Sequence, residues 1–309
     1  MTPAATVTAD RARDARLARR LLFPALAAIT VIVGVPLAWM LWESLHLHDL
    51  RMPWLGRPFI GLENYREAIH DPRFVVAVMH TLFFVAVSVT LELAGGLALA
   101  LTMHRVPYVV SGFSRTLLRV LILLPWAIPT AASALIWRFL FDGQAGVVNE
   151  ILVGLHVIAG PRVWLVDPTL AWIPIIAADV WKTTPFVALL LLAGLQSIDQ
   201  SLYDAARIDG AGPWREFTEI TLPLLTPAIV VTLAFRALDA FRVFDLIYVL
   251  TGGGPGTATE SVSLYTFSAL LQKLRFGYAS ALSMIVFAGT LGLGVIYIRL
   301  SNRHLLTRG

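Results

Sequence analysis

Four charged residues alternate in sign at every third position of an otherwise apolar stretch: Arg236, Asp239, Arg242 and Asp245. Side chains three apart on a helix can pair, and each step turns by about 60° around the helix. A charge that faces lipid at the centre of a bilayer costs about 2.5 to 3.5 kcal/mol, so these residues must be paired, hydrated or near a membrane surface. We expect chiefly a structural ion-pair network between helices, with substrate binding as the alternative, and we expect the Arg236–Asp239 pair to survive an exchange of the two residues.

A second polar group interrupts the preceding apolar stretch at VWKTTPF, residues 180–186. Asp179 and Lys182 are spaced to neutralise each other, while Trp181, Thr183 and Thr184 offer an aromatic face and hydroxyl groups. The following proline removes a backbone hydrogen bond and leaves a carbonyl free. Because sugars need neutral donors and acceptors plus an apolar ring face, these residues predict a sugar site in the membrane. The alternative is that Trp181 faces lipid or a partner helix.

Between the two groups lies the charged insert DAARIDGAGPWREFTEITLPLL, residues 204–225. It predicts two short helices, the first capped by Ser197 or Asp199 and ended by Gly210 in the left-handed conformation. Pro213 then starts the second helix, and the Leu222-Pro223 step closes the insert. Trp214, Phe217 and Ile220 recur on nearly one face of this second helix. Periodicity alone leaves open a hairpin that lies on lipid headgroups.

The insert resembles the EAA motif of permease subunits in ATP-binding-cassette importers, which is E-A-A, a glycine four residues on, and I-x-L-P. Asp204 stands where the motif usually has Glu. The other matching residues are Ala205, Ala206, Gly210, Ile220, Leu222 and Pro223. The resemblance implies that residues 197–223 form a cytoplasmic coupling loop whose apolar face, with Trp214 and Phe217, docks in a groove of an ATPase subunit.

Four further strings occur in the order typical of the carbohydrate-importer permeases of the maltose and trehalose type. They are GLENYREAI (61–69), WLVDPTLA (164–171), VWKTTPF (180–186) and LTGGGPG (250–256). This resemblance implies the type I importer permease fold and a sugar cargo, for example the disaccharide trehalose. It also implies three kinds of partner: a second homologous permease, two ATPase subunits and an extracytoplasmic sugar-binding protein. The chain has no phosphate-binding P-loop, so we expect ATP hydrolysis on the partners, and no enzymatic activity, cofactor or metal here.

The elements that must position these residues are membrane helices. With 57% hydrophobic and only 14% charged residues, and a mean hydropathy of +0.74, the chain is too apolar for a soluble domain of this size. Apolar stretches of about 20 residues cross a hydrocarbon core as helices. The fold class is therefore an all-α polytopic membrane protein with six transmembrane helices. The predicted spans are residues 21–42, 74–103, 116–141, 170–195, 222–250 and 279–298.

Lys and Arg outside the spans favour the side that carries the amino terminus, which predicts that both termini are cytoplasmic. We expect a cytoplasmic segment at 1–20, one transmembrane permease domain at 21–300 and a cytoplasmic tail at 301–309. The protein is expected to be a multi-pass protein of the cytoplasmic (inner) membrane. The net charge of +4 reflects this topology and attraction to anionic lipid, and nothing in its distribution indicates a nucleic-acid groove.

Several other functions are disfavoured. The absence of cysteine excludes a disulfide or thiolate nucleophile, and the histidines lack the HExxH spacing of a metalloenzyme. Glu92 is predicted to form a buried hydrogen bond with a neighbouring helix, while Gly95 and Gly96 indicate close helix packing. Two alternatives stay open: an ion-coupled secondary transporter with Asp179, Asp239 or Glu92 as its proton site, and an importer permease for glycerol phosphate or another small polar solute.

Overall fold

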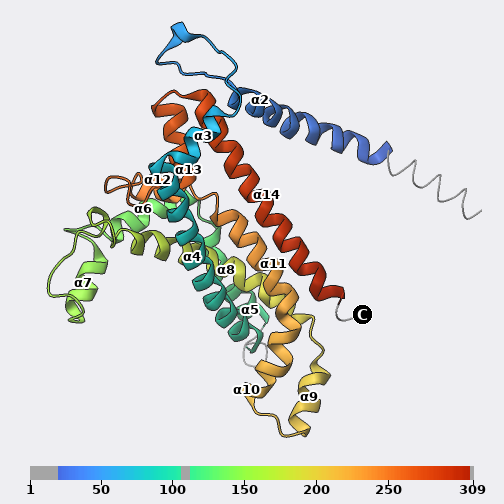
Figure 1. Ribbon diagram of the computed structural model, residues 1–309. Helices are drawn as coiled ribbons and strands as arrows, with labels where there is room; N and C mark the ends of the chain where they lie inside the picture. The colour runs from blue at the N-terminus through green and yellow to red at the C-terminus, as the bar shows by residue number, and fades with distance from the viewer. Residues whose placement is uncertain (1–19, 106–111, 307–309) are drawn as a thin grey trace, which may run out of the picture. The chain divides into compact units, whose positions relative to one another are not determined.

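The computed structural model describes residues 20–105 and 112–306. The predicted segment 1–20 lies outside the described residues except for Arg20, as do the last three residues of the predicted tail. The backbone forms two compact units (Figure 1). One combines the described residues up to Ile69 with Ser268–Ile285, and the other combines His70–Phe267 with the residues from Val286 onward.

The first unit contains the amino-terminal helical segment and the chain around α3. Its elements are a π-helical turn Thr30–Gly34, α2 (Val35–Ser44), a 3-10 turn Pro53–Leu55, α3 (Glu63–His70), a π-helical turn Ser268–Gln272 and the start of α14 (Phe276–Leu306). Asn64 Nδ2 donates to the carbonyl oxygens of Ser44 at 2.8 Å and His46 at 3.1 Å. Arg275 binds Glu67 through hydrogen bonds of 2.7 and 2.6 Å. Asn64 and Glu67 of GLENYREAI therefore join α3 to the segment after α2 and to the segment before α14.

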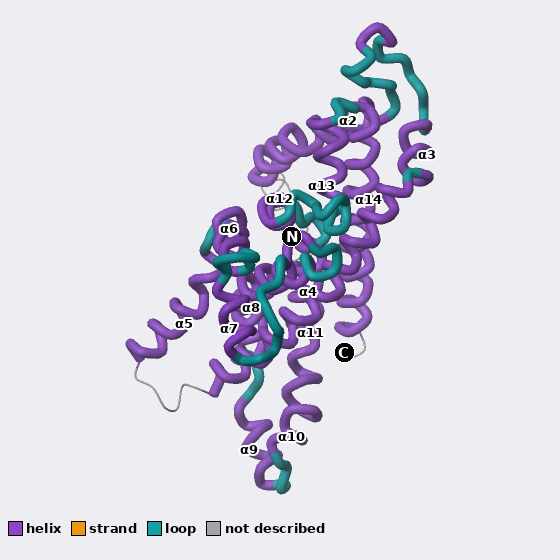
Figure 2. The backbone as a smooth tube through the Cα atoms, turned by 90° about the vertical axis from the view of Figure 1, so that its left-hand side faces the viewer, coloured by secondary structure: helices purple, strands orange, loops and turns teal. Residues whose placement is uncertain are grey.

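The second unit is built around the helix pair α4 and α8, which lie side by side (Figures 1 and 2). Its helices are α4 (Pro72–Arg105), α5 (Gly112–Ala127), α6 (Thr130–Leu140), α7 (Val147–Gly154), α8 (Trp172–Gln196), α9 (Gln200–Ile208), α10 (Pro213–Arg215), α11 (Leu222–Ala240), α12 (Asp245–Leu250) and α13 (Val262–Phe267). A Cβ on Gly96 would lie 2.9 Å from the Cβ of Val187, and one on Gly95 would lie 3.3 Å from Thr184 Cγ2. The predicted close packing at these glycines is confirmed.

Five helical segments are long and apolar enough to cross a membrane: Arg20–Ser44, Pro72–His104, Trp172–Gln196, Pro213–Ala240 and Phe276–Tyr297. The remaining predicted span, the third in chain order at residues 116–141, is not one straight helix. Its halves, Val120–Ala127 and Thr130–Leu140, are bent by 95°. Pro125 and Pro129 stand on either side of the break, where each removes a backbone N–H and crowds the preceding turn.

The fifth span begins and ends earlier than the predicted 222–250. Helix α11 ends at Ala240, and the chain turns before α12 starts at Asp245. Helix α12 packs against α6 and buries Leu246, Ile247 and Leu250, which are each no more than 2% exposed. Burial of these three side chains requires the change of direction, so Arg242 and Asp245 are not on the helix that carries Arg236.

The Leu222-Pro223 step does not close the insert, contrary to the prediction. The helix continues from Pro213 through a π-helical turn, Glu216–Thr221, into α11. Pro223 has no backbone N–H to donate, and its ring crowds the preceding turn of the helix. That preceding turn is the wider π-helical turn Glu216–Thr221. The insert and the fifth span are therefore one continuous helical rod.

The LTGGGPG string forms a tight loop after α12. Gly252, Gly253 and Gly256 have φ values of 61°, 88° and 60°, in the left-handed region that glycine adopts without strain. Farther along, buried Glu260 receives hydrogen bonds of 2.7 and 2.8 Å from Arg73. This ion pair ties the loop to the start of α4.

Candidate functional site

The insert forms a hairpin at one end of the second unit, beyond the end of α8 (Figures 1 and 2). Asp199 is the amino-terminal cap of α9: its Oδ1 accepts a hydrogen bond of 2.9 Å from the Ser201 N–H, which lowers the pKa of the Asp199 carboxyl. At the other end Gly210 has a φ of 79°. The Gly210 N–H donates to the Arg207 carbonyl, and the Ala211 N–H donates to the Ala206 carbonyl, which is a Schellman turn. The predicted cap at Asp199 and stop at Gly210 are confirmed.

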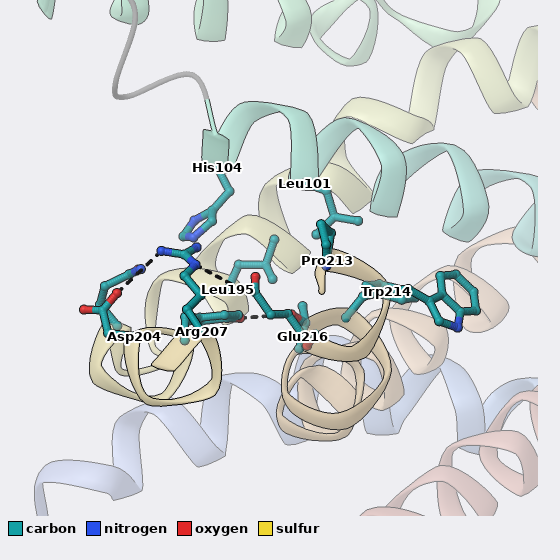
Figure 3. A pocket seen from close by; sticks show the side chains of 12 residues that line it. Leu101, His104, Leu195, Asp204, Arg207, Pro213, Trp214 and Glu216 are labelled. Atoms are coloured by element: carbon teal, nitrogen blue, oxygen red, sulfur yellow. Dashed lines mark hydrogen bonds and ion pairs between the residues drawn. The ribbon is translucent and has the colours of Figure 1, made fainter. Parts of the chain in front are cut away.

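Two contacts clamp the hairpin shut. Arg207 Nε donates to Glu216 Oε1 at 3.0 Å, while Arg207 Nη1 lies 3.5 Å from Asp204 Oδ1 on the same helix, as Figure 3 shows. Tyr203 and Thr221 are joined by a hydrogen bond of 3.0 Å between their hydroxyl groups. Because these bonds run between α9 and the rod that continues into α11, the hairpin is held as one piece.

The hairpin exposes two large apolar side chains among charged residues. Ile208 is 87% exposed and Trp214 is 76% exposed, and the Trp214 ring lies 6.0 Å from the half-buried Phe217 ring. Ala205 is exposed and Ala206 is half-buried on α9. The sequence analysis named Trp214 and Phe217 but not Ile208. A large apolar residue at the end of the otherwise polar helix α9 could have indicated that Ile208 is exposed.

A groove of about 1110 Å³ runs along the inner side of the hairpin (Figure 3). It is lined by the ends of α4 and α8 and by the two arms of the hairpin. The charged and aromatic lining residues are His104, Tyr203, Asp204, Arg207, Trp214, Glu216 and Phe217. Among the predicted coupling residues, Asp204, Trp214 and Phe217 thus share this groove, whereas Ile220, Leu222 and Pro223 are not among its lining residues.

Inside the spans, three helices bring carboxylates to one guanidinium. Arg236 of α11 donates to Glu92 of α4 at 2.5 and 2.9 Å. It also lies 3.3 Å from Asp179 of α8 and 2.5 Å from Asp239, one turn along its own helix. The Arg236 and Glu92 side chains are 4% and 0% exposed. We call these four residues the Arg236 cluster.

The cluster corrects two sequence predictions. Of the four charges that alternate in sign, Arg236 and Asp239 pair with each other, and the described residues show no ion pair of Arg242 or Asp245. Arg242 Nε donates to the Leu238 carbonyl at 3.3 Å, and Asp245 starts α12. Asp179 bonds with Arg236 and forms no ion pair with Lys182 in the described structure. Glu92 is buried against a neighbouring helix as predicted, and its partner is a charge rather than a neutral group.

Beside the cluster, the predicted sugar-site residues differ in access. Trp181 is 39% exposed, and its ring lies 6.0 Å from that of Trp137. Thr183 is buried and donates to the Asp179 carbonyl at 2.6 Å, while Thr184 packs toward Gly95 with a buried hydroxyl that has no partner in the described part of the chain. Asp239, with a side chain 65% exposed, is the open member of the Arg236 cluster. Trp181 and Asp239 are therefore the accessible polar and aromatic groups of this region.

Comparison with known proteins adds independent information. The family model described as "Binding-protein-dependent transport system inner membrane component" matches residues 93–305. The chain is 42% identical to the trehalose/maltose transport system permease protein MalF of Thermococcus litoralis, over 94% of this chain and 95% of that relative. It is 39% identical to the trehalose transport system permease protein SugA of Mycobacterium tuberculosis, over 95% of this chain and 91% of that relative. It is 38% identical to the sulfoquinovosyl glycerol transport system permease protein SmoG of Agrobacterium fabrum, over 93% of this chain and 91% of that relative.

Among solved structures, a chain of a bacterial ABC transporter involved in the import of the polysaccharide alginate is similar in fold. The TM-score is 0.79 at 24% sequence identity, with 96% of this chain and 99% of that chain covered. A chain of the MetNI methionine ABC transporter gives a TM-score of 0.53 at 15% identity, with 74% and 95% covered. The predicted all-α importer permease fold is confirmed.

Proposed function

The chain belongs to the family of binding-protein-dependent transport system inner membrane components, and from this membership we propose that it is a permease subunit of an ATP-driven sugar importer with a disaccharide such as trehalose as cargo. In this proposal both termini are cytoplasmic. The chain forms half of the path together with a second homologous permease, and it accepts sugar from an extracytoplasmic binding protein. Two separate ATPase subunits drive the cycle.

One observation carries the coupling role: the α9–α10 hairpin is rigid inside and exposes large apolar side chains outside. Ile208 and Trp214 are 87% and 76% exposed, which suits the buried centre of a protein interface. The Arg207–Glu216 bond joins the hairpin to the rod that runs through the π-helical turn into α11. A push on the hairpin therefore moves α11 and, through Arg236, acts on α4 and α8.

The coupling role is tested in the importer purified through a tag on this chain and reconstituted in liposomes. Trp214→Ser and Ile208→Ser should each lower ATP-dependent uptake at least about tenfold, since a central interface residue contributes more than about 1.4 kcal/mol. Glu219→Gln is the matched control, because within the described residues the exposed Glu219 side chain bonds only with Arg215 of the same arm. Wild-type uptake in both serine variants, with normal stimulation of ATP hydrolysis, would refute the coupling role.

We place the sugar path beside the Arg236 cluster. The accessible indole of Trp181 offers an apolar face for a sugar ring, and the Asp239 carboxylate accepts hydrogen bonds from hydroxyl groups. Lys182, Thr183 and Thr184 are the remaining path residues of this proposal. The cluster holds three carboxylates and one guanidinium, and this excess of negative charge favours a neutral sugar over glycerol phosphate.

The path is tested by uptake with saturating sugar-loaded binding protein. Trp181→Ala should lower sugar uptake while basal ATP hydrolysis and assembly are retained, and Trp181→Phe should restore part of it because an aromatic face remains. Normal uptake and sugar preference in Trp181→Ala, Thr183→Val and Thr184→Val would place the site on other helices. Uptake driven by an imposed proton gradient without ATP would favour the secondary-transporter alternative, and competition by glycerol phosphate rather than trehalose would change the cargo.

A further inference from the structure

Between α6 and α8 the chain forms a small folded unit around α7, and one buried amide holds it together. Asn149 is 3% exposed. Its Nδ2 donates to the carbonyl oxygens of Asp142 at 3.1 Å and Arg162 at 3.0 Å. Its Oδ1 accepts from the Arg162 N–H at 3.1 Å and from Trp164 Nε1 at 2.9 Å. These bonds fix the rotation of α7 about its own axis, so each of its faces has a defined environment.

The apolar residues of α7 form two adjoining sets, one covered and one uncovered. The inner face, with Val148 and Leu152, packs on a core of Phe141, Ile158 and Trp164. The outer face is uncovered: Val147, Ile151 and Leu155 recur every fourth residue and are 48%, 54% and 68% exposed. The apolar stripe of α7 is therefore wider than the part that the core covers, and a surface helix usually turns its whole apolar stripe toward a covering surface. The outer face therefore calls for an apolar covering.

We propose that α7 is an interfacial helix whose outer face lies in the boundary between acyl chains and headgroups of the membrane leaflet opposite the α9–α10 hairpin. The side follows from α8, whose 25 residues span about 37 Å between the two loops that carry α7 and α9. An amphipathic helix of this kind lies parallel to the membrane plane and buries its apolar face by about 5 to 10 Å.

Lipid fits the outer face better than a protein partner does. The three residues are aliphatic, whereas the centres of protein interfaces are enriched in aromatic residues and arginine. Glu150 of α7 is exposed, which leaves a charged side chain for the headgroup side of an interfacial helix.

The helix that precedes α7 in the chain also exposes apolar side chains. Phe139 and Leu135 on α6 are 78% and 49% exposed, and α6 ends only six residues before α7 begins. An interfacial α7 would stabilise the position of this neighbouring helix in the membrane. The third span is bent by 95°, so it lacks a straight crossing, and an interfacial anchor sets the depth of its outer half.

The chain has no cysteine, so single cysteines can report depth in the full-length protein. Ile151→Cys and Leu155→Cys are labelled with bimane after reconstitution in phosphatidylcholine vesicles with or without brominated acyl chains. Phe139→Cys is the control for a lipid-facing residue and Gln144→Cys, in the exposed loop before α7, is the control for an aqueous one. The rate of reaction with a membrane-impermeant maleimide is measured for all four variants.

The proposal expects brominated lipid to quench bimane at 151 and 155 to at least half the extent seen at 139, with maleimide reaction at least about tenfold slower than at 144. Fast reaction and no quenching at both positions would overturn it. Protection without quenching would also overturn it, because a protein surface would then cover the face, and protection that appears only on addition of a binding protein would identify that partner. None of these outcomes depends on the cargo or on the ATPase, so they are independent of the proposed transport function.

Discussion

Removal of the guanidinium from the Arg236 cluster should be among the most destabilising single changes in the second unit. Arg236→Met leaves Glu92, which is fully buried, and Asp179, whose side chain is 13% exposed, without the cation that both contact. Removing one partner of a buried pair costs about 3 to 5 kcal/mol, because the remaining charge stays in a low-dielectric site. Glu92→Gln should cost less, about 2 kcal/mol, since Arg236 keeps Asp179 and Asp239 and the amide still accepts one hydrogen bond.

The double variant Glu92→Gln/Arg236→Met gives the sharpest test, because the two residues share one bidentate contact. It should cost no more than Arg236→Met alone, which corresponds to a coupling energy of about 2 kcal/mol. Free energies of unfolding are measured by denaturant titration in detergent micelles, followed by tryptophan fluorescence and circular dichroism. Arg242→Met is the control, since Arg242 is exposed and bonds only within its own turn. Additive single effects, or a cost below about 1 kcal/mol for Arg236→Met, would refute the assigned role.

Three further outcomes are expected. Exchange of Arg236 and Asp239 should fail to restore assembly, because it turns a carboxylate toward Glu92 and Asp179; recovery of the assembled complex would contradict the cluster. Gly96→Val should destabilise the unit by about 1 to 3 kcal/mol through overpacking against α8, while Gly292→Ala, with nothing within 4 Å of the added Cβ, should be close to neutral in the same unfolding titration. Because the pKa of Asp199 is lowered in the folded protein, its cap stabilises α9 fully above the unfolded pKa of about 3.9, and this stabilisation is lost as pH falls through the lower folded pKa. Hydrogen exchange in α9 should therefore quicken over that pH range in the wild type but not in Asp199→Ala. Equal pH profiles for the two proteins would exclude the cap.

Much of the α9–α10 hairpin could be predicted because its structure is local. Asp199 bonds two residues away, and the Schellman turn at Gly210 joins residues within one helical turn. Such caps depend on backbone chemistry that a few neighbouring residues decide. The break in the third span is local as well, but Pro125 and Pro129 indicate only that a helix is interrupted, and the 95° bend depends on where α6 packs.

The sequence by itself determined the membrane class, most of the helical segments, the insert at residues 204–225 and the need to neutralise each intramembrane charge, because hydropathy and helical periodicity are properties of short stretches. Only the tertiary structure decided which charges meet. Arg236 bonds with Glu92 across 144 residues and with Asp179 across 57, although Lys182 stands at a suitable spacing from Asp179 on the same helix. The physical reason is rotation: helix packing turns α4, α8 and α11 so that three acids face one guanidinium, and this rotation is set by side-chain packing along the whole helices.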